Sequence, residues 1–377
     1  MSERLKITVA GAGIGGLAAA AALAQSGHSV VVAERAPEIG EVGAGIQISP
    51  NGMTVLRAIG VDGALEDLSL KGSAVRLFDG PSGREILALD LEKHGRGLEW
   101  RFVHRARLID VLKSAAEAAG VRVETGREVI PLPEGAALPG DDLLIGADGL
   151  HSKVRARVDE ASKPFFTKQV AWRALIPGDG PPVAEVHMGP GRHVVSYPLP
   201  GGLRNVVAVE ERSAWAEEGW SHRDHPGNLR GAFAGFSPRV KGWLEAVDEC
   251  FLWGLFRHRV ADRWWDRQQV LLGDAAHPTL PFLAQGANMA LEDAWALSAA
   301  IGAGSLPQGL AQYQDQRRAR VMRVVDAATA NARNYHLKSA PARFAAHSVL
   351  RLAGAVAPAQ PLRRLDWLYG YDVTKEA

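Results

Sequence analysis

Apolar runs and helical patterns alternate over the first 35 residues of the chain. The run KITVA at 6–10 has the length of a short buried strand, and the turn GAGIGG follows it at once. An alanine-rich stretch then predicts a helix to about Ser26, which Gly27 ends, and SVVVAE at 29–34 predicts a second strand. This order indicates a βαβ unit, in which the two strands lie parallel.

The alternation of strands and helices continues beyond this unit. Pro50 and Asn51 can start a helix that ends near Gly60, whereas 77–101 is strand-like with glycine turns. Residues 103–120 predict an amphipathic helix. The runs VRVETG and DDLLIGADG that follow predict two more strands of the parallel sheet.

The pattern changes near residue 165. Extended runs separated by glycine and proline turns fill 165–210, as in an antiparallel meander. From about 259 the pattern returns to a buried strand, QQVLLGDAAH, and helices follow to the end of the chain. The chain is therefore of mixed α/β character, with an antiparallel segment between two strand-and-helix regions.

Composition and charge narrow the class of protein. The 43 Lys and Arg nearly balance the 42 Asp and Glu, which argues against a protein that binds nucleic acid through its phosphates. The apolar share of 47% excludes disorder over most of the 377 residues, which suffice for two to three domains. Cys250 is the only cysteine, so dithiol chemistry and a cysteine-ligated metal site are excluded. A reducing, cytoplasmic location without a membrane span is expected.

The glycines of the first turn carry the first functional signal. Gly11, Gly13 and Gly16 form the pattern G-x-G-x-x-G, and Glu34 lies 23 positions after the first of them. Such glycines permit a tight turn, the approach of a pyrophosphate and the packing of helix on strand, while the carboxylate can accept hydrogen bonds from a ribose. The pattern predicts a dinucleotide site. The alternatives are a structural glycine-rich turn or a signal peptide, which 1–25 imitates in outline.

Several separated blocks together resemble a known family. They are GAGIGG with Glu34-Arg35, GEVGAGIQISPN, HRARL, LLIGADGLHSKVR, GRHVVSYPL, LLGDAAHPTLPFLAQGANMALEDA and LDWLYGYD, and they span nearly the whole chain. The chain resembles the group A FAD-dependent aromatic hydroxylases, in the branch of salicylate hydroxylase, 3-hydroxybenzoate 6-hydroxylase and 6-hydroxynicotinate 3-monooxygenase. The resemblance implies tightly but non-covalently bound FAD, with NADH or NADPH and O2 as co-substrates.

The resemblance also implies a fold. It is an α/β (α+β) protein with a discontinuous Rossmann-like FAD-binding domain, an inserted antiparallel sheet that forms the substrate-binding domain, and C-terminal helices. The expected ranges are 1–73, 100–164 and 260–330 for the FAD-binding domain, 74–99 and 165–259 for the substrate-binding domain, and 331–377 for the C-terminal helical segment. The tail LDWLYGYD is expected to dock on the body of the protein or on a neighbouring subunit, which leaves a homodimer open.

The resemblance assigns a set of residues to FAD, and some of them have a physical reason as well. Asp274 ends an apolar strand at a glycine, where its carboxylate would accept hydrogen bonds from ribityl hydroxyls, the alternative being a cap of the following turn. A helix that starts near Gly286 would aim its N-terminus at the flavin pyrimidine, where the helix dipole favours negative charge. No metal site is expected. The full set is Gly11, Gly13, Gly16, Glu34, Arg35, Gly45, Gln47, Arg105, Asp148, Gly149, Asp274, Pro281, Gly286 and Ala287.

The run RHVVSYPL supplies the substrate side of the expected site. In a strand His193, Val195 and Tyr197 share one face, and the resemblance makes His193 and Tyr197 substrate contacts, with Gln285 as a weaker catalytic candidate. His193 is the expected base or relay for a phenol, and Tyr197 is expected to orient the ring or bind a substituent. The alternative is a half-buried strand with satisfied polar groups. The candidates for binding a substrate carboxylate are Arg173, Arg192 and Arg84.

The expected activity is hydroxylation of a small phenolic or hydroxy-aromatic acid, salicylate-like or 3-hydroxybenzoate-like, through a flavin C4a-hydroperoxide. Attack by that species needs an electron-rich ring, and a phenol becomes one when it loses its proton. One alternative is a related flavin monooxygenase with another substrate, such as a quinone-pathway hydroxylase or an epoxidase. A non-catalytic flavin-binding protein is the other alternative.

Overall fold

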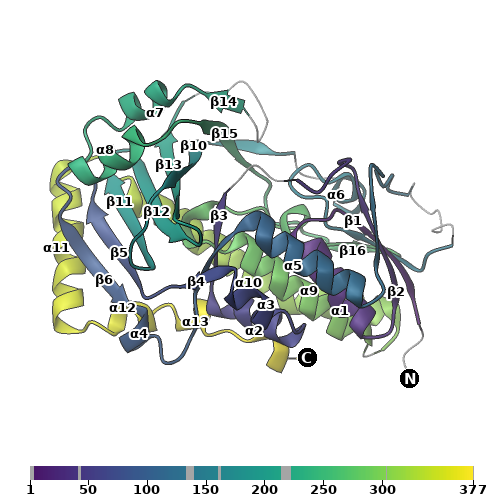
Figure 1. Cartoon of the computed structure of the whole chain (residues 1–377). Coiled ribbons are helices and arrows are strands. Elements are labelled where there is room, and N and C mark those ends of the chain that lie inside the picture. Colours follow the sequence, from purple (N-terminus) through teal and green to yellow (C-terminus); the bar gives the residue numbers. More distant parts are fainter. Residues whose placement is uncertain are drawn as a thin grey trace.

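The structure is a computed structural model that describes residues 4–40, 44–132, 140–159, 163–213, 222–302 and 304–376. A six-stranded sheet lies at the N-terminal end of the molecule (Figure 1). Neighbouring strands of this sheet run parallel to each other, except that β16 and β17 at one edge are antiparallel. The order across this sheet is β16 (Trp265–Asp266), β17 (Gln269–Leu271), β9 (Leu143–Gly146), β1 (Lys6–Ala10), β2 (Ser29–Glu34) and β8 (Arg122–Thr125).

Helix α1 (Ile14–Gln25) joins β1 to β2, so the βαβ unit expected from the sequence is confirmed. The first ten residues of α1 are all buried, because the helix packs against both strands and against α5 (Arg105–Ala118) and α9 (Gly286–Gly302). The small side chains of α1 permit this close packing from all sides. Helix α10 (Leu306–Tyr335) packs on α9 and closes this layer.

A second sheet of eight strands lies at the other end of the molecule (Figure 1). Its neighbours are antiparallel, except that β5 and β11 run parallel. Helices α7 (Pro226–Ala232) and α8 (Pro238–Glu245) pack on one face, and α11 (Ala340–Val356) packs on β6. The order across this sheet is β14 (His222–Asp224), β15 (Cys250–Arg257), β10 (Phe165–Pro177), β13 (Leu203–Glu211), β12 (Arg192–Leu199), β11 (Val183–Gly189), β5 (Ala74–Asp79) and β6 (Glu85–Asp90).

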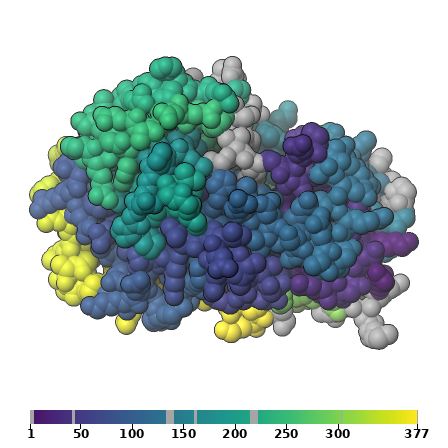
Figure 2. Space-filling model, in the orientation of Figure 1, coloured from purple at the N-terminus to yellow at the C-terminus, as the bar shows by residue number. Residues whose placement is uncertain are grey.

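A small antiparallel sheet of β3 (Gly45–Ile48), β7 (Arg101–His104) and β4 (Ser69–Lys71) completes the strands. In the space-filling view, the purple N-terminal residues and the green residues of the second sheet lie at opposite ends, with blue residues between them (Figure 2). The remaining short elements are α2 (Pro50–Ala58), α3 (Asp62–Glu66), α4 (Leu91–His94), α6 (Lys153–Val158), α12 (Gln360–Arg363), α13 (Asp366–Tyr369) and the 3₁₀ turns η1 (Gly273–Ala275), η2 (Pro281–Leu283) and η3 (Val373–Lys375).

The α/β fold with an inserted, largely antiparallel sheet is confirmed, but two local expectations are wrong. The strand-like region 77–101 contains the helix α4, whose first turn Asp90 caps by accepting from N of Lys93. Strand β10 pairs with β13 and β15 and not with β11, so 165–210 is not a simple meander. Helix α10 runs without a break through residues 330 and 331, where the C-terminal helical segment is expected to begin.

The C-terminal tail docks on the body of the protein, one of the two expected places. The Arg320 guanidinium donates to the carbonyls of Trp367 and Leu368 at 2.9 and 3.0 Å and lies 3.7 Å from the ring centre of Tyr371. These contacts fix the tail against α10 through charge-assisted hydrogen bonds and a cation–π contact. None of the helices in the described part of the chain has the length and apolar character needed to cross a membrane.

Candidate active site

Two adjoining cavities run from the parallel sheet to the second sheet. One, of about 540 Å³, begins at the turn after β1 and is lined by Gly11, Glu34 and Arg35. The other, of about 320 Å³, reaches His193 and Tyr197 on β12. Together they suit an elongated ligand that has two chemically different ends. They adjoin each other, and the residues that line both include Gly13, Arg105, Gly149, Arg173, Trp253 and Asp274.

The three glycines of the first turn have different surroundings. Gly11 has a φ of +106°, and a Cβ on it would lie 2.5 Å from the carbonyl oxygen of Ala147. A Cβ on Gly16 would collide with the carbonyl oxygen of Gly11, because the helix packs closely on the turn at this point. A Cβ on Gly13 would meet no heavy atom within 4 Å and would enter the cavity. The turn therefore keeps its backbone open toward the cavity at Gly13, at the N-terminus of α1, as a phosphate cradle requires.

Replacing Gly13 with valine is expected to leave the fold intact and to weaken FAD binding by about 100-fold or more. The valine side chain would occupy the space of the pyrophosphate. The pyrophosphate would then lose charge-assisted hydrogen bonds to the turn, which contribute about 1.5–3 kcal/mol each. FAD binding to the apoprotein, followed by flavin fluorescence, measures the effect. The control is Gly63→Val in α3, where a Cβ also meets nothing within 4 Å but which lines neither cavity. Equal affinity in the two variants would contradict the cradle.

Glu34 and Arg35 lie at the far end of the larger cavity. The Glu34 carboxylate accepts hydrogen bonds from N of Ala12 and N of Ala36, both at 2.8 Å. These two bonds fix the carboxylate at the end of β2 and leave lone pairs for a ribose diol. The Arg35 side chain is 75% exposed, with Glu128 3.9 Å away.

Two aspartates at the ends of neighbouring parallel strands differ in their partners. The Asp148 carboxylate accepts from Oγ of Ser152, the N-cap of α6, at 2.5 Å and from N of Lys153 at 2.8 Å. It therefore holds the start of α6, while the residue also lines the larger cavity. No hydrogen bond from the described residues reaches the Asp274 carboxylate, which does not cap the turn that follows it. Burial raises the pKa of Asp274, and the positive charge of Arg105 opposes this. Asp274 is therefore the carboxylate available to a ligand.

Helix α9 begins at the smaller cavity. Pro281, Gly286 and Ala287 line that cavity, and Ala284, with a φ of +52°, turns the chain from η2 into the helix. The free N–H groups and the positive end of the helix dipole therefore meet the cavity. This arrangement stabilises negative charge on a ligand that lies against the start of α9.

The opposite wall of the smaller cavity comes from the second sheet. His193, Val195 and Tyr197 all line it, as the alternation along β12 predicts. The Tyr197 ring packs on Phe102, and burial raises the pKa of its hydroxyl, which therefore stays protonated. Gln47 lines the same wall. Gly45 packs tightly there, since a Cβ on it would lie 2.8 Å from the Tyr197 ring.

The His193 imidazole is buried, with one nitrogen bonded inside the protein. Its Nδ1 lies 2.7 Å from Nε2 of His336, and the ring packs against Phe282 and Tyr335. Burial, and then the neighbouring His336, lowers the pKa of His193 well below its usual value. The imidazole is therefore neutral at pH 7. Among the described residues no hydrogen bond reaches Nε2, which is left for a ligand in the cavity that His193 lines.

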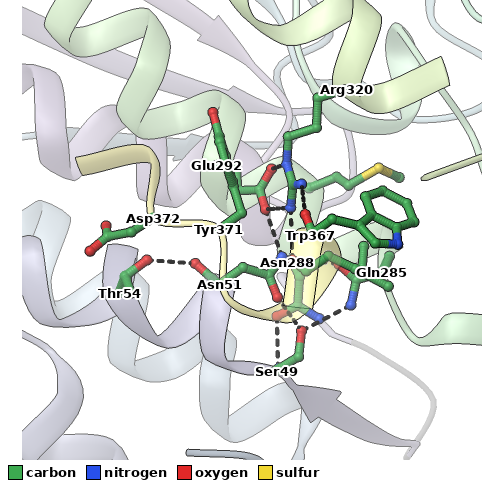
Figure 3. Close-up of polar contacts among 12 residues, drawn as sticks. Ser49, Asn51, Thr54, Gln285, Asn288, Glu292, Arg320, Trp367, Tyr371 and Asp372 are labelled. Atoms are coloured by element: carbon green, nitrogen blue, oxygen red, sulfur yellow. Dashed lines mark hydrogen bonds and ion pairs between the residues drawn. The ribbon is translucent and has the colours of Figure 1, made fainter. Parts of the chain in front are cut away.

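The structure places Gln285, the weaker catalytic candidate, away from the two cavities. Gln285 is 1% exposed and does not line either cavity. Its amide accepts from Nδ2 of Asn51 at 3.0 Å and donates to Oγ of Ser49 at 2.9 Å (Figure 3). Asn51 also donates to Glu292, so these side chains form a buried network between α2 and α9. Gln285 fixes the start of α9 from behind.

Two of the three arginines considered for a substrate carboxylate lie elsewhere. The Arg192 guanidinium donates to the carbonyl of Ala232 and pairs with Glu210 at 3.3 Å, on the face of β12 away from the cavity. Arg84 is exposed in the turn between β5 and β6. Arg173 lines both cavities, and its guanidinium lies 4.5 Å from the ring centre of Trp253. Arg173 is the candidate that the structure retains.

Sequence reasoning missed several residues of the site. His336 bonds to His193 from the end of α10, 143 positions away, and no local signal marks it. Asn205 on β13 accepts from N of Gly45 at 2.8 Å and fixes that strand against the second sheet. Trp253 and Leu255 line the wall from β15, and their alternation along a strand was the one signal available.

A family model described as an FAD binding domain matches residues 4–137 and 241–328, which is more than half of the chain. The chain belongs to this FAD binding domain family. The matched residues hold the glycine turn, Arg105 and Asp274, the same residues that line the two cavities. The open cradle at Gly13, the helix N-termini and the available carboxylate of Asp274 fit FAD with its adenine end toward Glu34.

Relatives of this FAD binding domain family match over nearly the full length. The 3-amino-4-hydroxybenzoate 2-monooxygenase PtmB3 of Streptomyces platensis is 32% identical and the alignment covers 98% of this chain and 97% of the relative. The 3-hydroxybenzoate 6-hydroxylase 1 of Aquipseudomonas alcaligenes is 31% identical, with 98% of each chain covered. This chain is an FAD-dependent monooxygenase that uses NAD(P)H and O2.

Solved structures show the same architecture. HpxO of Klebsiella pneumoniae, solved with FAD, is 27% identical with a TM-score of 0.82, over 95% of this chain and 97% of that one. A salicylate hydroxylase solved with its substrate is 21% identical with a TM-score of 0.81, over 99% of this chain and 97% of that one. The second likeness is one of fold.

Proposed function

We propose that the protein hydroxylates a small aromatic acid that carries a phenolic hydroxyl, with the ring bound between β12 and the start of α9. The observation that carries the proposal is His193, a neutral imidazole in the cavity wall whose Nδ1 is held by His336 and whose Nε2 is left to a ligand. A neutral imidazole that can accept a proton suits the activation of a phenol. FAD, held along the glycine turn, Arg105 and Asp274, supplies the redox chemistry that transfers one oxygen atom from O2.

The walls of the smaller cavity support an aromatic acid as substrate. Val195, Val207 and Val209 offer an apolar surface to a ring, and Arg173 supplies a cation for a carboxylate. The protonated Tyr197 hydroxyl can donate to a ring substituent from the same strand as His193. The names of PtmB3 and of the hydroxylase from Aquipseudomonas alcaligenes describe hydroxybenzoates as substrates, which supports the same class for this chain.

The test is product analysis with the FAD-loaded enzyme. Salicylate, 3-hydroxybenzoate, 4-hydroxybenzoate and 6-hydroxynicotinate are each supplied with NADH or NADPH, and phenol serves as the control without a carboxylate. At least one acid is expected to stimulate nicotinamide oxidation and to yield a product with one more oxygen or with a carboxylate replaced by hydroxyl. Phenol is expected to bind more weakly because it lacks a partner for Arg173. The same slow oxidation with and without all these compounds would overturn the proposal. Epoxide or quinone products from other rings would favour the related monooxygenases.

We infer that the reaction takes place in the cytoplasm. NAD(P)H is available there, and the single cysteine, Cys250, is buried and forms no disulfide within the chain. Fractionation of cells that express the protein, followed by immunodetection, tests this placement. Detection outside the cytoplasmic fraction would overturn it.

A further inference from the structure

A line of hydrogen-bonded side chains leads from the smaller cavity to the surface. Nδ1 of His193 lies 2.7 Å from Nε2 of His336, and Nδ1 of His336 lies 3.1 Å from Oε1 of Glu211. The Glu211 side chain is 32% exposed, and its other oxygen lies 2.6 Å from Nζ of Lys338 at the surface. The three groups therefore span the sheet wall, from the cavity at one end to solvent at the other.

The ionised carboxylate at the solvent end of this line determines which nitrogen of each imidazole carries the proton. Burial acts to raise the pKa of Glu211, but hydrogen bonds from Lys338 and His336 hold it below its usual value, so the carboxylate is ionised and can only accept. His336 must then carry its proton on Nδ1 and present a lone pair on Nε2. His193 must donate from its own Nδ1 to that lone pair, and this leaves a lone pair on Nε2 facing the cavity.

The backbone holds the line in place. N of Gly191, in the turn before β12, donates to the carbonyl of His336 at 3.2 Å, and N of Glu211 donates to the carbonyl of Gly191 at 2.9 Å. The rings of Phe282 and Tyr335 pack around the two imidazoles and separate them from water. One turn thus ties together the three elements that carry His193, His336 and Glu211.

The charged groups around His336 come from every element that packs on it. Glu211 of β13 faces it as an anion, while Lys338 after α10 and Arg192 of β12 are cations nearby. Burial lowers the pKa of His336, and Glu211 opposes this effect. His336 is therefore neutral at rest, and its cation forms beside a carboxylate that stabilises it. Neither imidazole retains a proton that it receives.

We propose that His193, His336 and Glu211 form a proton relay that carries the phenolic proton of the substrate from the cavity to solvent. This inference rests on the proposed function. The substrate hydroxyl gives its proton to Nε2 of His193, whose Nδ1 proton passes to Nε2 of His336. The Nδ1 proton of His336 passes to Glu211 and from there to water. One proton leaves the substrate, one enters solvent, and no electrons are transferred.

The relay can be observed without turnover. The probe is 4-hydroxy-3-nitrobenzoate, whose phenolate absorbs visible light, mixed with the oxidised holoenzyme at a pH at which it is a phenol in solution. In the native enzyme it is expected to become phenolate quickly on binding. His336→Gln keeps a donor toward Glu211 and an acceptor toward His193 but cannot pass a proton, and it is expected to slow the appearance of phenolate by about 10- to 100-fold. Glu211→Gln is expected to slow it as well.

Two further variants separate proton transfer from structural support. His336→Ala opens a space beside Glu211, and added imidazole is expected to restore the rate in proportion to its concentration, whereas His336→Gln stays slow. The matched control is His187→Gln, which removes a buried histidine that pairs with Glu185 in the same sheet at 3.2 Å and lies outside both cavities. This control is expected to react like the native enzyme.

Native rates in both His336 variants, or a slow His336→Ala enzyme that imidazole does not accelerate, would overturn the relay while leaving the proposed function in place. A native enzyme that binds the probe without forming phenolate, and that hydroxylates none of the phenolic acids, would instead overturn the proposed function.

Discussion

Replacing His193 with glutamine is expected to lower the rate of product formation by about 10²- to 10⁴-fold while FAD stays bound, because a positioned general base contributes a factor of this size. Glutamine fills similar space and can still bond to His336, but it cannot take a proton at the pH of the reaction. The side chains that surround the imidazole, those of Phe282, Tyr335 and Val195, are retained in the variant sequence. The loss therefore reports the proton acceptor and not the shape of the cavity.

Product formation measured by chromatography at saturating aromatic acid gives this loss in kcat. The flavin absorbance of the purified variant and the dissociation constant of the acid, from the flavin spectrum, provide the controls. The flavin content is expected to stay near the native value, since His193 lies on the substrate side of the cavity. The dissociation constant reports any weaker binding of the acid separately from the loss in kcat. A variant with intact FAD and unchanged product formation would show that the role assigned to His193 is wrong.

The parts of the fold that follow from local spacing could be predicted from the sequence. The spacing of the glycines determines the turn between strand and helix, because Gly16 packs against the carbonyl of Gly11 and Gly11 has a positive φ. The alternation along β12 placed His193 and Tyr197 on one face. The same alternation excludes Arg192, since a neighbour of His193 in a strand must point to the opposite face.

The parts that depend on distant partners could not be predicted. Gln285 stands at the start of a helix whose sequence fits the flavin side, yet its amide turns toward Asn51, 234 positions away. His336 meets His193 only because α10 ends against the turn before β12. A single sequence does not show which side chain at the end of a helix lines a cavity and which packs into the core. The order of the eight strands could not be predicted for the same reason, because β10 pairs with β13 and β15, which lie far from it in the sequence.

A buried ionic network lies behind the site, and we expect its disruption to lower the free energy of unfolding more than any other change described here. Arg317 is fully buried on α10 and pairs with Glu292 at 2.6 Å and with Asp293 at 2.8 Å. Asp293 also accepts from N of Gly273 at 3.0 Å and lies 2.5 Å from Nε2 of His277. The network therefore fixes the turn that carries Asp274. Burial acts to raise the pKa of Asp293, but His277 and Arg317 hold it at about 2.

Arg317→Met is expected to lower the free energy of unfolding at pH 7 by about 3–5 kcal/mol, because it leaves buried carboxylates without their cation. The pH dependence changes as well. An aspartate whose pKa is lowered on folding stabilises the fold above its unfolded pKa of 3.8, and this contribution is lost as the pH falls through about 2. Without Arg317 the pKa of Asp293 rises, so the carboxylate takes up a proton more readily and the penalty of leaving it unpaired falls at acid pH. The difference in free energy of unfolding between the native protein and the variant is therefore expected to be largest at pH 7 and to narrow as the pH falls toward 3.

Urea unfolding of the FAD-free protein at pH 7 and at several values down to pH 3 measures both effects. The matched control is Arg318→Met, the next residue, whose partner Asp262 is 84% exposed. This control is expected to change the free energy by less than about 1 kcal/mol, as an exposed ion pair does. Equal stability of the two variants would contradict a structural role for the network. A weaker affinity for FAD in Arg317→Met alone would follow from the same cause, since the turn at Gly273 that holds Asp274 in the cavity loses its support.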